Sequence, residues 1–186
     1  MPEHDRHHKI VDARLCEKEQ IMMQAPIPAN EVERMHALRS LLLLDTPPEE
    51  RFDSITAFAA AKFNVPMAVV TLVDENRQWF KARVGVPVCE TGRDVSFCGH
   101  AIMTPATMVI PDARRDPRFA DNPLVTGEPY VCFYAGAPLH LPTGEIVGTL
   151  CIMDTKPRQM DKTDLAVLGV LRALVMEELQ RQAVAA

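Results

Sequence analysis

The sequence lacks the features that would assign it to a membrane, to nucleic acid or to a metal. No apolar run approaches the roughly 18 residues that a transmembrane helix needs, and residues 1–25 lack the apolar core of a signal peptide. We therefore expect a cytoplasmic protein without a membrane partner. The formal net charge of −5 supplies no basic field for nucleic acid. Cysteine and histidine do not occur in a zinc-type spacing, so we expect no metal site.

Cysteine is present but in an odd number, which argues against a set of structural disulfides. The five residues are Cys16, Cys89, Cys98, Cys132 and Cys151. In a reducing compartment each thiol behaves first as a small hydrophobic side chain. The length of 186 residues and the 47% apolar fraction fit one soluble domain.

The hydrophobic pattern predicts an α+β fold. Residues 1–28 form a polar leader, flexible or helical, that ends in a proline stop, and residues 29–186 form a single domain. Neighbouring strands joined by short turns indicate a mostly antiparallel sheet with helices packed on one face. The predicted helices are 29–45, 47–65 and 161–182, with a short one from 97, and the predicted strands are 66–74, 76–85, 107–112, 131–141 and 146–154.

The stretch "ETGRDVSFCGHAIM", residues 90–103, places a thiol and an imidazole close together. Ser96 is suited to cap a short helix, and the positive end of that helix would lower the pKa of Cys98 in its first turn. His100 is two residues further on and does not face Cys98 on a helix. A Cys–His catalytic dyad is therefore geometrically poor. Cys98 is either a buried side chain beneath a pocket or a reactive thiol.

The segment 112–129 has no apolar periodicity and is long for a loop in a small domain, which indicates a functional lid. We expect Phe119 and Leu124 to dock inward. The arginines of the loop could clamp an anionic ligand, or they could pair with its own aspartates. The residues concerned are Arg114, Arg115 and Arg118, and Asp112, Asp116 and Asp121.

Three motifs together resemble one known family. "ETGRDVSFCGHAI", "IPDARRDPRFADNPLVTGEPYVCFYAGAPL" and "GTLCIMDTKPR" follow one another within residues 30–182. In this order they are similar to GAF domains of the bacterial sensory type, found ahead of diguanylate cyclases and histidine kinases. The resemblance implies a six-stranded antiparallel sheet flanked by helices, and a small-molecule pocket between the sheet and the long loop. It also implies a homodimer formed through terminal helices, within two-component or cyclic di-GMP signalling.

The function that this resemblance implies is a small-molecule-sensing regulatory domain that is not an enzyme. No cyclase, phosphodiesterase, kinase or DNA-binding segment is present. We therefore expect a separate signalling effector protein, or a chain that is part of a larger one. The ligand is unidentified and no cofactor is indicated. The candidate ligand-binding residues are Phe97, Cys98, His100, Asp112, Arg118, Phe119, Tyr134 and Ala135.

Two alternatives use cysteine chemistry. GAF folds include free methionine-R-sulfoxide reductases, and Cys98, Cys89 and Cys132 loosely resemble their thiol set. A reversible disulfide between Cys89 and Cys98 would instead make a redox sensor. A bilin or haem sensor is less well supported because Gly99 separates the cysteine from the histidine. The signature of cyclic-nucleotide-binding relatives is absent.

Overall fold

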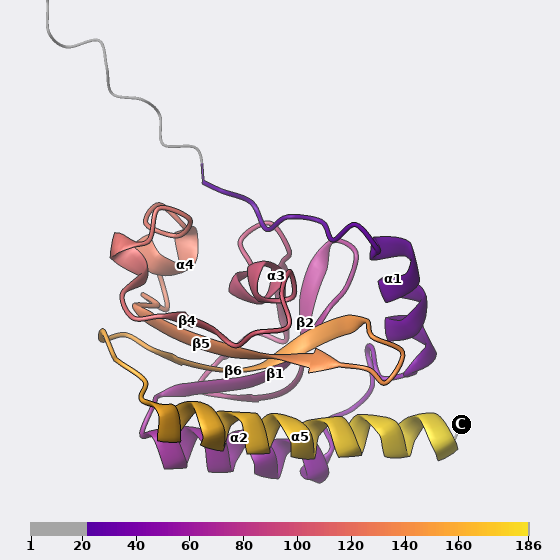
Figure 1. Ribbon diagram of the computed structural model, residues 1–186. Helices are drawn as coiled ribbons and strands as arrows, with labels where there is room; N and C mark the ends of the chain where they lie inside the picture. The colour runs from indigo at the N-terminus through magenta and orange to yellow at the C-terminus, as the bar shows by residue number, and fades with distance from the viewer. Residues whose placement is uncertain (1–21, 186) are drawn as a thin grey trace, which may run out of the picture.

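The computed structural model describes residues 22–185, which form a central sheet with helices on both sides (Figure 1). The helices are α1 (Glu31–Ser40), α2 (Glu50–Phe63), α3 (Phe97–Ala101), α4 (Pro123–Thr126) and α5 (Lys162–Ala185), with a 3-10 helix, η1 (Ala113–Arg115). The strands are β1 (Met67–Val73), β2 (Arg77–Val84), β3 (Glu90–Gly92), β4 (Met108–Ile110), β5 (Phe133–His140) and β6 (Ile146–Asp154).

The six strands form one antiparallel sheet in the order β3-β2-β1-β6-β5-β4. The predicted α+β class and the six-stranded sheet are confirmed. Every residue of β1 is buried, because the strand is central and covered on both faces. This burial explains why residues 66–74 are almost continuously apolar in the sequence.

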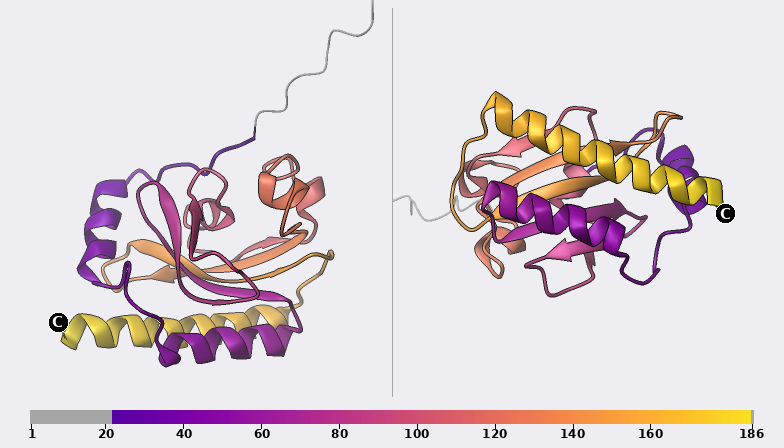
Figure 2. Two further views of the ribbon diagram at one scale, coloured as in Figure 1. Left: turned by 180° about the vertical axis from the view of Figure 1, so that it is seen from behind. Right: turned by 90° about the horizontal axis from the view of Figure 1, so that it is seen from below.

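Two layers cover the sheet, and the helices do not all pack on one face as the element order suggested. The long helices α2 and α5 lie side by side on one face, called here the helix face (Figure 2). The short helices α3 and α4 lie over the opposite face, called here the pocket face, and α1 stands at one end of the sheet (Figure 1). Together with α3, the segment between β4 and β5, which folds back over the sheet, provides this second layer.

The two faces have separate cores because successive side chains of a strand point to opposite sides. Phe52, Leu72 and Leu168 belong to the core beneath the helix face. Phe97 and Phe119 belong to the core on the pocket face. Each core has its own covering layer, so a change in the pocket layer can occur without repacking α2 and α5.

The N-terminal end of the described chain runs across α3. Residues 1–21 of the predicted leader lie outside the described residues, and 22–28 form neither helix nor strand. Ala25 is buried and its amide donates to the carbonyl of Asp94 at 3.2 Å. The carbonyl of Met23 lies 3.2 Å from Nε2 of His100. Residues 22–28 thus contact α3 directly.

One helix ends earlier than predicted, and one short strand was not predicted. The first helix stops at Ser40 rather than 45, because Leu42 and Asp45 have φ values of 52° and 60°. Strand β3 was not predicted, since three residues are too few to show an alternating pattern. Among the described residues, no helix combines the length and apolar character needed to cross a membrane.

Candidate functional site

Helix α3 is fixed by the cap that its sequence predicts. The hydroxyl of Ser96 accepts from the amide of Gly99 at 2.8 Å and donates to Oε1 of Gln78 at 2.6 Å. The cap therefore ties α3 to β2 as well as starting the helix. A Cβ atom on Gly99 would lie 2.6 Å from that of Ala25, so glycine allows residues 22–28 to pass over the helix.

A pocket of about 450 Å3 lies between the pocket face of the sheet, α3, and the loops around 85–88 and 124–131. This volume is within the range of small-molecule sites. Among the described residues, no arginine or lysine lines the pocket. Its apolar lining is Met67, Val69, Phe80, Val86, Pro87, Val88, Phe97, Leu124, Pro129, Val131 and Met153, and its polar lining includes Thr71, Gln78, Thr91, Cys98, Glu128, Tyr134 and Cys151.

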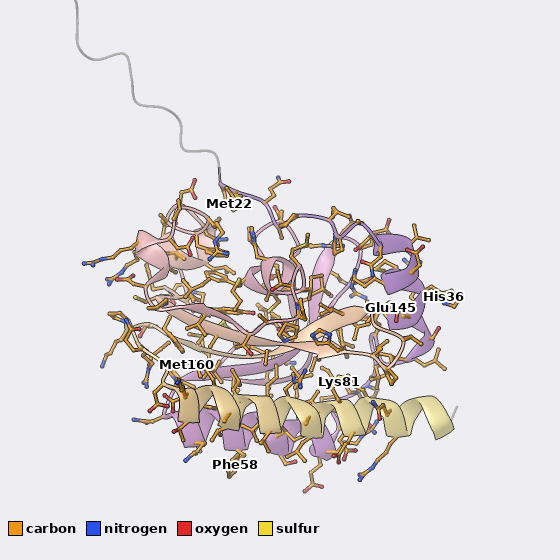
Figure 3. All side chains as sticks on the ribbon, viewed as in Figure 1. Met22, His36, Phe58, Lys81, Glu145 and Met160 are labelled. Carbon is orange, nitrogen blue, oxygen red and sulfur yellow. The ribbon has the colours of Figure 1, made fainter. Side chains whose placement is uncertain are left out.

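A second, larger hollow of about 830 Å3 lies between α1 and the turn of the β5–β6 hairpin. Figure 3 shows His36 and Glu145 at this end of the molecule. Val32 lines it and is 80% exposed, so it is an open surface groove. Because its walls are less enclosed than those of the pocket beside α3, we take the latter as the candidate site.

Sulfur and hydroxyl groups gather at the floor of the pocket. The sulfur atoms of Cys98 on α3 and Cys151 on β6 are 3.8 Å apart. The phenol of Tyr134 donates to the sulfur of Cys98 at 3.4 Å, and the hydroxyl of Thr71 lies 3.6 Å from it. Thr149 is fully buried beside them, and its hydroxyl makes no hydrogen bond of normal geometry. The cluster is therefore polar within an otherwise apolar floor.

The surroundings of the two thiols shift their pKa values in opposite directions. Burial raises the pKa of Cys98, but the polar groups around it, Cys151 first and then Thr149, Tyr134 and Thr71, outweigh burial and lower this pKa below its usual value. The hydrogen bond to Cys98, together with burial, raises the pKa of Cys151 well above its usual value. One thiolate shared between the two sulfur atoms accounts for both directions.

Phe97, Cys98 and Tyr134, out of the eight candidate ligand-binding residues, line the pocket. Phe119 lies behind them, fully buried, with its ring stacked on Phe97 at a centroid distance of 4.2 Å. Phe119 thus docks inward as expected, but it packs behind Phe97 and does not line the pocket. His100 packs edge-on against Phe119, and burial lowers the pKa of its imidazole.

The charged candidates of the loop pair with each other and do not line the pocket. Arg114 binds Asp112 at 2.8 Å, and Arg118 binds Asp116 at 2.6 Å. Asp112 also caps η1 by accepting from the amide of Arg114. Of the two interpretations that the sequence left open, local pairing is the one that matches these contacts.

Ala135 requires a correction, because it does not face the pocket. It is fully buried in the core of the helix face, whereas its neighbour Tyr134 points to the pocket face. Adjacent residues of a strand point to opposite faces, so Tyr134 and Ala135, which were both expected in one site, lie in different cores. The room next to Tyr134 comes from Gly136, where a Cβ atom would lie 2.1 Å from the phenol oxygen.

The sequence reasoning missed the pocket residues of β1, β2 and β6. Thr71 and Cys151 come from strands 80 residues apart in number, and their side chains meet because β1 and β6 pair in the sheet. Alternation within each strand shows which residues share a face, but not which strands are neighbours. The strand order was therefore the missing information.

The predicted cysteine set is not brought together. The thiol of Cys132 contacts Oδ1 of Asp112 at 3.3 Å, and burial raises its pKa. Cys89 is exposed and lines a different hollow together with Lys81. The thiol in contact with Cys98 is that of Cys151, which the sequence analysis had treated only as a small side chain.

Comparisons with known proteins agree with this architecture. A six-stranded antiparallel sheet, with long helices on one face and a pocketed loop layer on the other, is the architecture of a known sensory fold. The family model of the GAF domain matches residues 47–179, and the chain belongs to the GAF family.

Relatives and structural neighbours come from signalling and from enzymes. The chain is 40% identical over 156 residues to a cyclic di-GMP phosphodiesterase of Pseudomonas aeruginosa, covering 83% of this chain and 27% of that protein's length. It resembles the GAF domain of an Acinetobacter phosphoenolpyruvate-protein phosphotransferase, with a TM-score of 0.59 and 16% identity over 82% of this chain and 96% of that one. The free methionine-R-sulfoxide reductase of Neisseria meningitidis has a TM-score of 0.60 and 18% identity over 83% and 91%.

Proposed function

We propose that this GAF domain is a regulatory sensor that binds a small, uncharged and largely apolar molecule in the pocket beside α3. The pocket itself carries this proposal. It is of ligand size, its walls are mainly apolar, and no lysine or arginine of the described residues lines it. A phosphate-bearing ligand would leave its charge without a cationic partner there. The relative from Pseudomonas aeruginosa supports a role in cyclic di-GMP signalling rather than cyclic di-GMP as the ligand.

The response would begin in the loop that closes the pocket. Leu124 and Val131 line it from the segment that folds over the sheet. Asn122 fixes that segment by donating to the carbonyl of Val95 at 3.0 Å, just before α3. A ligand that favours one arrangement of the loop would therefore shift α3 and residues 22–28 packed on it. A signalling effector, separate or continuous with a longer chain, would receive this change.

The first test is native mass spectrometry of the freshly purified protein with a matched pair of variants. Val88 lies at the mouth of the pocket and is 48% exposed, so Val88→Trp narrows the entrance with little effect on the core. Val32→Trp makes the same change in the groove beside α1. We expect a retained ligand on wild type and on Val32→Trp, and at least about tenfold weaker retention on Val88→Trp, a loss of roughly 1.4 kcal/mol.

The opposite pattern, with loss only in Val32→Trp, would move the sensor site to the groove beside α1. A bare mass would be followed by thermal-shift screening of neutral aromatic and aliphatic compounds against the same three proteins. If no compound stabilises wild type more than Val88→Trp, the proposed binding role is wrong.

We also propose a homodimer formed through the outer surface of α5. Val170 is 62% exposed and Leu174 is 41% exposed on the side of α5 away from the sheet. Phe58 projects from α2 into solvent in the same layer, and is 57% exposed (Figure 3). Several large apolar side chains gathered on one outer surface are typical of an interface. A second copy supplies the same surface, as a two-fold interface requires.

Val170→Glu is expected to weaken this dimer by at least about tenfold, because each interface would contain two opposed carboxylates. The dimer dissociation constant is measured by analytical ultracentrifugation. Val32→Glu, which adds the same charge on α1, is the control and should leave the constant unchanged. Equal dissociation of both variants would place the interface elsewhere.

The observed contacts do not favour the reductase alternative. The resemblance to the Neisseria meningitidis enzyme is below 25% identity and concerns the fold alone. The set Cys98, Cys89 and Cys132 is dispersed over three environments, with only Cys98 in the pocket.

A further inference from the structure

The paired sulfur atoms at the pocket floor are a feature that ligand binding does not explain. Cys98 and Cys151 come from different elements, α3 and β6, and are only 4% and 0% exposed. Their sulfur atoms are 3.8 Å apart, and both residues line the pocket. A disulfide bond is about 2.0 Å long, so the sulfur atoms would have to approach by roughly 1.8 Å. Cys98 is the more accessible of the two, so a small oxidant that enters the pocket meets Cys98 first.

The groups around the pair favour chemistry at one sulfur. Tyr134 donates to the sulfur of Cys98 at 3.4 Å, and the hydroxyl of Thr71 lies 3.6 Å from the same sulfur. The buried hydroxyl of Thr149, without a hydrogen bond of normal geometry, is a further donor available to a developing thiolate. Hydrogen bonds to the charged form stabilise a thiolate, which is the nucleophilic form of cysteine.

The other described cysteines lack this arrangement. Cys132 faces the carboxylate of Asp112, which disfavours a thiolate. Cys89 is exposed, and within residues 22–185 its thiol contacts no other thiol. The chain thus contains internal controls for both a buried and an exposed cysteine.

We propose that Cys98 and Cys151 form a redox-active dithiol that hydroperoxides oxidise to a reversible disulfide. This oxidation would not require the pocket ligand. It replaces the expected Cys89–Cys98 pair with the pair that the structure places in contact.

The reaction balances in two steps with hydrogen peroxide as oxidant. The thiolate of Cys98 attacks one peroxide oxygen, the O–O bond breaks, hydroxide leaves from the peroxide, and Cys98 becomes a sulfenic acid. The thiol of Cys151 then attacks the sulfur of that sulfenic acid, the S–O bond breaks, and water leaves. In total two thiols lose two protons and two electrons, and peroxide becomes two molecules of water. A dithiol reductant reverses the change by thiol–disulfide exchange.

The disulfide would act on the layer that covers the pocket. It would draw α3 towards β6 and remove the thiol that accepts from Tyr134. Because residues 22–28 pack on α3 through Ala25, the oxidised state would also change the support of the N-terminal segment. Oxidation and ligand binding would then both act on α3.

The test is peroxide oxidation of the full chain, with thiols alkylated after quenching and mapped by peptide mass spectrometry. We expect a Cys98–Cys151 disulfide as the first product, with Cys98 reacting at least about tenfold faster than Cys132 in the same molecules. Cys132→Ser should leave the product and rate unchanged. Cys151→Ser should stop at a sulfenic acid on Cys98, which dimedone traps.

A second variant tests the role of the phenol without removing a cysteine. Tyr134→Phe removes the donor and keeps the ring, so alkylation of Cys98 at neutral pH should slow about tenfold and its pH profile should shift upward, as expected for one lost hydrogen bond to a charged group. The proposal is overturned if peroxide first links Cys89 to Cys98, or if Cys98 is overoxidised while Cys151 remains a free thiol. Equal rates for Cys98 and Cys132 in the wild type would also overturn it, whatever the folding of the variants.

Discussion

Replacing Glu31 with glutamine is expected to lower the free energy of unfolding by about 3 kcal/mol at neutral pH, because two buried guanidinium groups lose their counterion. Glu31 binds Arg34 at 2.8 Å and Arg93 at 2.5 Å. These arginine side chains are only 1% and 5% exposed. Arg34 also donates to the carbonyl of Val73 at 2.6 Å. The buried cluster of Glu31, Arg34 and Arg93 therefore joins α1 to the end of β1.

The effect should depend on pH in a defined direction. Burial raises the pKa of Glu31, but the hydrogen bonds from Arg34 and Arg93 outweigh it and lower the pKa from 4.5 to about 2. A carboxyl whose pKa is depressed in the folded state contributes stability above its unfolded pKa and loses it in acid. The difference between wild type and Glu31→Gln should therefore be full above about pH 5 and shrink as the pH falls towards 2.

Urea denaturation followed by circular dichroism at several pH values measures this difference. Glu33→Gln is the matched control, because Glu33 is an exposed acid in the same helical turn. It removes the same charge and should change stability by less than about 0.5 kcal/mol. If the two variants lose the same stability, the buried cluster does not hold α1 in place.

The same cluster explains why a change at one end of the sheet can reach the pocket. Arg93 lies three residues before Ser96, the residue that caps α3, and it also donates to the carbonyls of Asp74 and Glu75 at 3.2 Å. The start of α3 is thus held from α1 and from the β1–β2 turn. A mild ligand-binding defect in Glu31→Gln, beyond its loss of stability, would be consistent with this connection.

Local patterns in the sequence predicted local structure well. The cap at Ser96 was predicted and is formed, and Asp161 accepts from the amide of Asp164 at 2.8 Å as a cap of α5 should. Asn30 directly precedes α1 and is of a residue type that often caps helices, but its side chain makes no such bond. A capping residue type permits the bond without requiring it, because ion pairs such as those of Glu31 can position the first turn instead.

The site was less predictable because it depends on contacts between distant segments. Tyr134 and Ala135 are adjacent in sequence and lie in different cores, so membership in one motif did not mean membership in one site. Cys98 and Cys151 are in contact through the pairing of elements that no local pattern connects. Ligand pockets of this kind are lined by several strands at once, and their composition follows from strand order.

Replacing Gly148 with alanine is expected to destabilise the fold by more than about 4 kcal/mol or to prevent folding, and so to abolish the pocket. Gly148 lies in β6 opposite Leu72 of β1. A Cβ atom there would be 1.9 Å from the carbonyl oxygen of Thr71 and 3.1 Å from Cα of Leu72. These atoms belong to the backbone of the central strand, so a side-chain rotation cannot relieve the contact.

The same substitution at Gly169 is the control and should act in the opposite direction. Gly169 lies within α5, and a Cβ atom there would meet nothing within 4 Å. Alanine favours a helix over glycine by about 0.8–1.0 kcal/mol, so Gly169→Ala should raise the free energy of unfolding by up to that amount. Urea denaturation of both variants measures the two effects. Thr149 and Cys151 follow Gly148 on β6 and form part of the pocket floor. A Gly148→Ala protein with wild-type stability would show that β1 and β6 can move apart without a loss of stability. The tight packing described for the pocket floor would then be wrong.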